Sequence, residues 1–501
     1  MKDTSTLNPN PLSRFLEKPN QDFTKSDLIR FIESHGIEMI NFRYAGADGR
    51  LKTLNFVINS RKQLDNLLSA GERVDGSNLF PNYVKAGSSD LYVIPRYHTA
   101  FMNPFSEVPA LDILCSYYDK DGLPFENSPE YILKKSHQVF REKTGMIFEA
   151  MGELEYYIIS DQDPSYVTMD ERGYHESPPF TKWEGLRLEA MRAIAKCGGN
   201  IKYGHSEVGN FSEEGLSFEQ NEIEFLPVKL EDAADQLLIA KWVLRNLAYK
   251  YKATATFAPK ITTGKAGSGL HIHTKITKDG KNIMVTDGTL SVTAKKVIAG
   301  YVDLAQSLTA FGNMIPTSYF RLVPNQEAPV SICWGDNNRS ALIRVPLGWN
   351  STNNMISDCN PSERDSEYDF TSRQTVEFRC PDGSADIYLL LAGLTVAARH
   401  GLTMPNALNI AKETYIDINV FEEKQKNRTT HLKQLPDSCW HSADCLDKQR
   451  AIYEQFNVFP RQIIDGIIKT LRSYNDEHLR ASIKDNEKEI LKLVKAYQHC
   501  G

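Results

Sequence analysis

The chain has 501 residues, which is long for a single hydrophobic core, so we expect two domains or one large domain with an appendage. A formal net charge of −6 gives no support to nucleic-acid binding by bulk electrostatics, and no apolar run is long enough to span a membrane. The opening residues lack the apolar segment of a signal peptide. We therefore expect a cytoplasmic protein with a flexible N-terminal arm over residues 1–22.

The next part of the chain predicts a small mixed α+β unit over residues 23–119. Apolar residues at helical spacing, strand-like runs and a turn signal at residues 45–49 carry this prediction. The predicted elements are, in order, a helix over 26–35, a hairpin of strands 38–43 and 51–57, a helix over 61–70, and short strands from 91 to 118.

Residues 120–501 predict a larger domain in which helices alternate with strands. The predicted helices cover residues 128–143, 181–197, 231–251 and 389–400, and much of the chain from 447 to its end. The strands between them carry the charged motifs.

The motif Glu153-Leu154-Glu155 lies in a strand-like run over residues 148–159. Successive side chains of a strand alternate faces, so both carboxylates project from the same side. Such a pair repels itself unless a cation or a proton lies between its members. It is costly in a core and useful in a divalent-metal site, although a solvated strand face would also accommodate it.

The same spacing recurs in three further strand-like runs. They place Glu222 beside Glu224, His271 beside His273 and Lys275, and Glu377 beside Arg379, each backed by apolar residues. This pattern predicts a curved sheet with a polar concave face. The charges on that face would need compensating ions and an anionic ligand.

Two loops and several arginines extend this candidate site. The small residues of segment 265–271 let backbone approach a ligand, and prolines on both sides of Glu327 stiffen the loop over residues 321–330. Arginine suits planar recognition of phosphate and carboxylate, and the candidate arginines are Arg321, Arg339, Arg344 and Arg379.

Taken in order, these motifs resemble the glutamine synthetase family over roughly residues 25 to 480. The motifs are Glu153-Leu-Glu155, His205-Ser-Glu207, Gln220-Asn-Glu222, Gly267-Ser-Gly-Leu-His271-Ile-His273, Arg321-Leu-Val-Pro, Glu327-Ala-Pro-Val, Asn338-Arg339-Ser340 and Glu377-Phe-Arg379-Cys-Pro-Asp382.

The resemblance implies an α+β fold with a β-grasp-like N-terminal domain over residues 23–119. The catalytic domain over residues 120–501 would hold a curved antiparallel sheet, or half-barrel, flanked by helices. The family builds rings of subunits, typically two stacked in a dodecamer-like double ring. Each active site lies between the N-terminal domain of one subunit and the sheet of its neighbour.

The resemblance also implies roles for individual residues. Glu155, Glu207 and Glu222 would bind one Mg²⁺ or Mn²⁺, and Glu153, His271 and Glu377 would bind a second. Asp75, Tyr174 and Glu207 would form the ammonium pocket. Arg321, Glu327, Gly267 and Arg379 match glutamate-binding positions, Arg339 and Arg344 match phosphate-binding positions, and His273 lies at the ATP.

The implied reaction is ATP-dependent formation of glutamine from L-glutamate and ammonia through a γ-glutamyl phosphate. Asp75 would accept the ammonium proton, Glu327 would close the site, and Arg339 would offset charge on the transferring phosphate. Two departures from the family pattern concern the substrates: Ala266 stands where an asparagine is usual, and the loop from Glu207 to Glu222 is longer.

These departures leave two alternatives open. The first is a ligase that joins glutamate to a larger amine, such as a polyamine. The second is a ring-forming relative without catalysis. Retention of the whole set of metal ligands argues against the second, because a purely structural role does not need inward acids and imidazoles at metal-binding positions.

Overall fold

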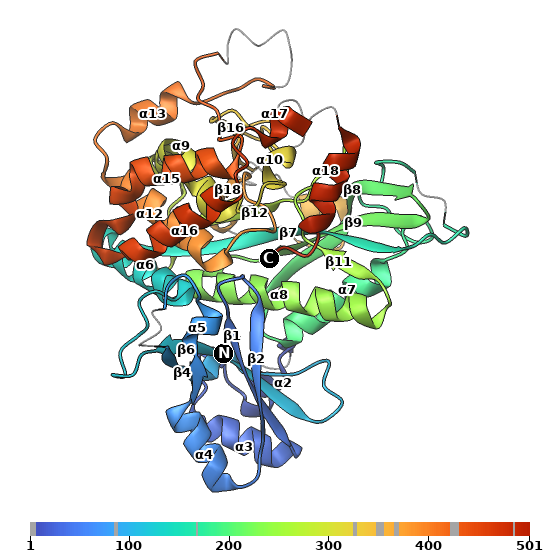
Figure 1. Cartoon of the computed structure of the whole chain (residues 1–501), viewed down its shortest axis with the longest axis vertical. Coiled ribbons are helices and arrows are strands. Elements are labelled where there is room, and N and C mark those ends of the chain that lie inside the picture. Colours follow the sequence, from blue (N-terminus) through green and yellow to red (C-terminus); the bar gives the residue numbers. More distant parts are fainter. Residues whose placement is uncertain are drawn as a thin grey trace.

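The computed structural model describes residues 7–84, 89–166, 169–323, 328–346, 355–364, 370–420, 430–483 and 486–501. Figure 1 shows a smaller N-terminal domain, in blue, below a larger domain, with helix α8 (Leu230–Lys250) crossing between them. Each domain has its own main hydrophobic core. The fold is α+β, as predicted.

The N-terminal domain is a β-grasp sheet covered by helices. Its strands lie in the order β2-β1-β6-β4-β3, with β5 beside β6, and the parallel pairing of β1 with β6 interrupts an otherwise antiparallel sheet. The elements are α3 (Lys25–His35), β1 (Met39–Ala45), β2 (Leu51–Val57), α4 (Arg61–Ala70), β3 (Glu72–Asp75), α5 (Gly76–Leu79), β4 (Asp90–Pro95), β5 (Phe101–Met102) and β6 (Ala110–Tyr118). The predicted hairpin and both predicted helices are present.

The prediction of a flexible N-terminal arm over residues 1–22 is wrong for residues 11–22. Residues Pro11–Leu16 form helix α2, and a 3₁₀ turn follows at Asn20–Asp22. Asn10 caps α2, Pro11 occupies its first turn, and Leu12 and Leu16 are buried in the core of the N-terminal domain. Burial of these two leucines fixes the segment on the domain.

The larger domain is built around a curved sheet in the order β16-β17-β18-β12-β7-β9-β8. Its pairings are antiparallel except that of β16 with β17. The strands are β7 (Ile147–Asp161), β8 (Ile201–Glu213), β9 (Leu216–Phe225), β12 (Leu270–Lys278), β16 (Trp334–Asp336), β17 (Ile343–Val345) and β18 (Val376–Phe378), with β10 (Val228–Lys229) and β11 (Thr254–Thr256) beside β7 and β13 (Lys281–Asn282) beside β12.

Helices cover the apolar face of this sheet and leave its polar face free. In β7 the side chains of Leu154, Tyr156 and Ile158 point into the core, and a Cβ at Gly152 would lie 2.8 Å from Leu237 of α8. The described helices of this domain, not all of which touch the sheet, are α6 (Pro129–Thr144), α7 (Glu184–Lys196), α8, α9 (Val292–Gly312), α10 (Ser318–Arg321), α11 (Met355–Cys359), α12 (Ile387–Thr403), α13 (Ala407–Glu413), α15 (Cys439–Glu454), α16 (Arg461–Ser473), α17 (Leu479–Ile483) and α18 (Glu487–Ala496).

Within the described ranges no single helix is long and apolar enough to cross a membrane. One bent pair, Ile387–Thr403 with Ala407–Glu413, passes that test by length and composition alone.

Candidate active site

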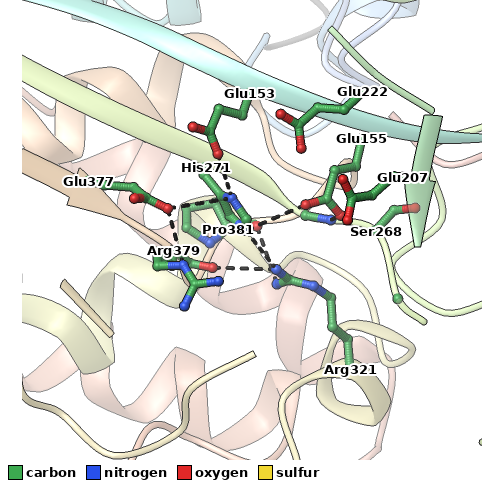
Figure 2. Close-up of polar contacts among 12 residues, drawn as sticks. Glu153, Glu155, Glu207, Glu222, Ser268, His271, Arg321, Glu377, Arg379 and Pro381 are labelled. Carbon is green, nitrogen blue, oxygen red and sulfur yellow. Dashed lines mark hydrogen bonds and ion pairs between the residues drawn. The ribbon is translucent and has the colours of Figure 1, made fainter. Parts of the chain in front are cut away.

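The register of the sheet brings the charged motifs together on its polar face. Strand β7 lies between β12 and β9, which sets Glu153 opposite His271 and Glu155 opposite Glu222. Pairing of β12 with β18 sets His273 opposite Glu377. Residues that face each other across paired strands have adjacent side chains, so four separate sequence motifs form one cluster. Figure 2 shows Glu153, Glu155, Glu207 and Glu222 gathered around His271.

This cluster lies in a cavity of about 1390 Å³. With two exceptions, every site residue predicted from the sequence lines it. The lining includes Glu153, Glu155, Tyr174, Glu207, Glu222, Gly267, His271, His273, Arg321, Arg339, Arg344, Glu377 and Arg379. The exceptions are Asp75, which does not line the cavity of its own chain, and Glu327, which lies outside the described residues.

One group of candidate cation ligands lies between β8 and β9. Oxygens of Glu207 and Glu222 lie within 4.8 Å of a ring nitrogen of His205, and Glu155 faces Glu222 across the strand pair. Nδ1 of His205 lies 3.5 Å from a carboxylate oxygen of Glu207, and Nε2 lies 3.5 Å from one of Glu222. Burial lowers the pKa of His205, which favours the neutral ring that a metal requires. Our sequence analysis gives His205 no role, although it points to the same face of its strand as Glu207.

A second group surrounds Glu153. Its carboxylate oxygens lie 2.9 Å from Nδ1 of His271 and 2.8 Å from Nε2 of His273. Burial alone would raise the pKa of Glu153, but the two histidines hold it well below its usual range. Glu377 completes the group, with an oxygen 3.7 Å from His271. His273, predicted to lie at the ATP, also bonds Oγ1 of Thr375 at 2.9 Å, so its ring is fixed among the metal-ligand candidates.

The balance of charge in these groups fits divalent cations. Burial and the repulsion of Glu153, Glu155, Glu207 and Glu224 raise the pKa of Glu222 well above its usual range. In the part of the chain that the structure describes, Oε2 of Glu224 is buried without a hydrogen-bond partner. Mg²⁺ and Mn²⁺ prefer carboxylate oxygen, and neutral imidazole is a common additional ligand. The residues present therefore fit two such cations.

Arginines border the carboxylates on the other side of the cavity (Figure 2). Glu377 is held by Nη1 of Arg344 at 3.0 Å and by Nε of Arg379 at 3.1 Å. Arg321 is buried and donates to the carbonyls of Cys380 at 2.9 Å and Pro381 at 3.3 Å. These contacts fix the guanidinium groups next to the cation ligands, where they can bind an anionic substrate.

The small residues of segment 265–269 allow the backbone to approach these groups closely. A Cβ at Gly269 would lie 2.5 Å from Nη2 of Arg321, and the Gly269 amide donates to Oε2 of Glu155 at 2.7 Å. Ala266 is held through its backbone. Its carbonyl accepts from the Tyr157 hydroxyl at 2.9 Å, and its amide donates to Glu171 at 2.7 Å.

The loop predicted between Glu207 and Glu222 is wrong, because this segment forms the hairpin of β8 and β9. That the segment is longer than is usual in the family stays a prediction. The strands continue to Glu213 and resume at Leu216, joined by Glu214 and Gly215 with φ of 50° and 80°. Alternating residues of the described segment 169–176 then pair with β8, since Gly173 donates to the Val208 carbonyl at 3.1 Å and His175 to the Ser206 carbonyl at 2.9 Å.

This pairing brings Tyr174 to the cavity. Its ring stacks on His175 with centroids 4.2 Å apart and meets His205 edge-on at 5.5 Å. Asp75 is placed differently. It is exposed and caps helix α5 through a 2.9 Å bond from the Ser77 amide, and hydrogen bonds from Ser77 and Asn78 lower its pKa.

Comparison with known proteins shows which family the chain belongs to. The model described as "Glutamine synthetase, catalytic domain" matches residues 126–491, and "Glutamine synthetase, beta-Grasp domain" matches residues 36–120. The chain belongs to the glutamine synthetase family. Together the two matches cover most of the sequence, including every motif on which the resemblance rests.

Among curated family members, the glutamine synthetase of Clostridium saccharobutylicum is 28% identical over 433 residues, covering 85% of this chain and 89% of that protein. The glutamine synthetase of Thermus thermophilus is 27% identical over 448 residues, covering 86% and 91%. Both proteins are less than 30% identical to this chain.

Solved structures show the same fold. The Plasmodium falciparum glutamine synthetase has a TM-score of 0.74 at 21% identity, covering 93% of this chain and 98% of that one. A protein described as "Apo GmaS without ligand" has a TM-score of 0.71 at 19% identity, covering 91% and 96%. As a member of the family the protein is a ligase, and the family generally uses ATP and divalent metals.

Proposed function

We propose that this protein forms glutamine from L-glutamate and ammonia at the expense of ATP, through a γ-glutamyl phosphate. The observation that carries the proposal is that two groups of cation ligands and a set of fixed arginines share one cavity. This arrangement suits transfer of a phosphoryl group to a carboxylate, in which negative charge on the phosphate oxygens must be offset.

The residues divide the chemistry between them. Glu155, Glu207, Glu222 and His205 would hold one Mg²⁺ or Mn²⁺, and Glu153, His271, His273 and Glu377 the other; when bound, these ions neutralise charge on the phosphates of ATP. Arg339 and Arg344 line the same cavity and would contact the transferring phosphoryl group. Arg321 and Arg379 lie at the glutamate end, where their backbone and carboxylate contacts keep them oriented.

The second step requires a neutral amine. An ammonium ion bound at Tyr174 and Glu207 must first lose a proton. The resulting ammonia attacks the acyl phosphate, and the carbon-nitrogen bond forms as phosphate leaves. Asp75 is our proposed proton acceptor. Since it does not line the cavity of its own chain, a neighbouring subunit of a ring would supply it. Glu327 is proposed to close the site over the intermediate. The double ring and a cytoplasmic location belong to the same proposal.

A larger primary amine is the second candidate nucleophile. Two tyrosines that line the cavity near Glu207 and Glu222, Tyr174 and Tyr203, are 48% and 45% exposed. Their rings contact His205. An aromatic wall of this kind can receive the apolar body of an alkylamine, and a cationic amine is attracted to ring faces. A non-catalytic role explains none of these features.

The test is phosphate release from Mg-ATP with L-glutamate, comparing ammonium with a panel of primary amines and identifying each product by mass. Glutamine formed from ammonium with the highest kcat/KM supports the proposal. Turnover only with an amine supports the second candidate. No turnover with any nucleophile, in a protein that binds Mn²⁺, would contradict both.

A further inference from the structure

Gln220 lies opposite a bulge, where β8 departs from regular pairing with β9. Ser206 of β8 faces Asn221 of β9, but the next pair is Asn210 with Glu219. Three residues of β8, Glu207 to Gly209, therefore face only Gln220, and this makes a bulge. The bulge carries Glu207, a candidate cation ligand. Its geometry consequently decides where that carboxylate lies.

The side chain of Gln220 replaces backbone contacts that the bulge removes. Its Oε1 accepts from the Gly209 amide at 3.0 Å. A side chain at Gly209 would break this arrangement, because a Cβ there would lie 1.9 Å from the Tyr157 hydroxyl and 2.8 Å from Oε1 of Gln220. The amide of Gln220 thus fixes one end of the segment that presents Glu207.

The other end of the same side chain reaches the cation ligands and the substrate segment. Nε2 of Gln220 lies 3.3 Å from Oε2 of Glu155, 3.0 Å from the Gly267 carbonyl and 3.3 Å from Oγ of Ser268. Gln220 is 1% exposed, so these bonds are sheltered from water. A buried polar network of this kind holds its members in a single arrangement.

We propose that Gln220 is a positioning residue that couples cation binding to amino-acid binding. It contacts Glu155 and the Glu207 bulge on the cation side and Gly267 on the amino-acid side. A cation that fixes Glu155 and Glu207 also fixes Gln220, and through it Gly267 and Ser268, while Glu155 itself holds the Gly269 amide. The amino acid then meets a segment that is already ordered, which strengthens its binding. The assignment of the amino acid rests on the proposed function.

Gln220→Met tests this coupling, because methionine keeps length and volume but cannot make the hydrogen bonds. Gln236→Met is the matched control. Gln236 is also buried and accepts one backbone amide, from Asn200 at 3.0 Å, but it does not line the cavity. Calorimetry would measure the Kd of L-glutamate with and without saturating Mn²⁺ in each protein.

In the wild type and in Gln236→Met we expect Mn²⁺ to tighten L-glutamate binding by about tenfold, within the usual range of coupling between sites. In Gln220→Met the factor should fall below about threefold, as the hydrogen bonds that carry it are gone. Equal coupling in Gln220→Met and wild type would overturn the inference.

A second measurement does not depend on the amino acid or on the folding of the glutamine variants. Hydrogen exchange of wild type and Ser268→Ala, with and without Mn²⁺, reports directly on segment 266–269. We expect Mn²⁺ to slow exchange there in the wild type, and to slow it less in Ser268→Ala, which lacks one acceptor of the Gln220 amide. Unchanged exchange in the wild type would overturn the inference. Absent glutamate binding with slowed exchange would instead overturn the proposed function alone.

Discussion

Glu155→Gln is the substitution that separates cation binding from folding most cleanly. Glu155 is 8% exposed, and its Oε2 accepts a hydrogen bond from the Gly269 amide. The side-chain oxygen of a glutamine can accept the same hydrogen bond. Among the residues that the structure describes, the basic group near it is His271, whose ring nitrogen is 3.8 Å away. The negative charge of Glu155 is therefore available to a cation, and the substitution removes it without removing the side chain.

The magnitude follows from the lost charge. A unit charge about 4 Å from another contributes about 4 kcal/mol at an effective dielectric constant of 20. Reduced repulsion among the remaining carboxylates offsets part of this loss. We expect a net loss of about 3 kcal/mol, or roughly a hundredfold in the Kd for Mn²⁺. The same relief of repulsion should make the cation-free variant more stable than the cation-free wild type, since Glu155 contributes to the raised pKa of Glu222.

The assay is calorimetric titration with Mn²⁺, combined with thermal unfolding without added cation. Glu149→Gln is the control. Glu149 lies on the same strand but is paired with Lys275 at 2.7 Å, so its loss should leave the Kd for Mn²⁺ unchanged. A Glu155→Gln variant that binds Mn²⁺ as tightly as wild type would refute the reasoning. So would an equal loss in Glu149→Gln.

Further predictions concern protons and buried hydrogen bonds. Asp232→Asn should raise the free energy of unfolding by about 1–2 kcal/mol above pH 6 and have no effect near pH 4. Burial and Asp235 raise the pKa of Asp232 from 3.8 to about 6. The wild type therefore loses stability as the pH rises from about 4 to 6, and the substitution removes this loss. Denaturation of both proteins at about pH 4 and about pH 7.5 measures the difference. Mn²⁺ binding should release protons at acidic pH, because the cation offsets the burial and repulsion that raise the pKa of Glu222, and titration in buffers of different ionisation enthalpy would measure this. Net proton uptake would contradict it. Tyr157→Phe should cost about 1–3 kcal/mol in urea denaturation, because the buried Ala266 carbonyl loses the Tyr157 hydroxyl; an unchanged midpoint would show that the carbonyl finds another donor.

The polar face of the sheet could be predicted because strands alternate. Glu153 with Glu155, His271 with His273, and Glu377 with Arg379 each project from one face at a spacing of two, and the structure places all of them on that face. Alternation alone does not say which strands are neighbours. The register that sets Glu153 opposite His271 is a property of the folded sheet. The resemblance to a family grouped the two residues at one cation but did not give this register.

Other features were missed. Helix α9 is largely buried, and our sequence analysis does not predict it, although α8 and α12 are buried to a similar or greater extent and are predicted. The hairpin beyond Glu207 does carry a local signal that our sequence analysis does not use, because Phe211, Leu216 and Phe218 alternate with polar residues on the two sides of the turn at Glu214 and Gly215. The roles of His205 and Gln220 depend on the bulge in β8, which exists only once β8 and β9 have paired. Asp75 lies in a different domain from the cavity, and no local pattern connects the two.

The measurement that tests the central claim most directly follows the oxygen of the substrate carboxylate. L-glutamate labelled with ¹⁸O in its γ-carboxylate is turned over with Mg-ATP and a nitrogen nucleophile, and the released phosphate is analysed by mass. If the carboxylate attacks the γ-phosphoryl group, as we propose, one labelled oxygen enters phosphate for each amide formed. Phosphate free of label would show that water, and not the carboxylate, attacks ATP, and this would contradict the acyl-phosphate route.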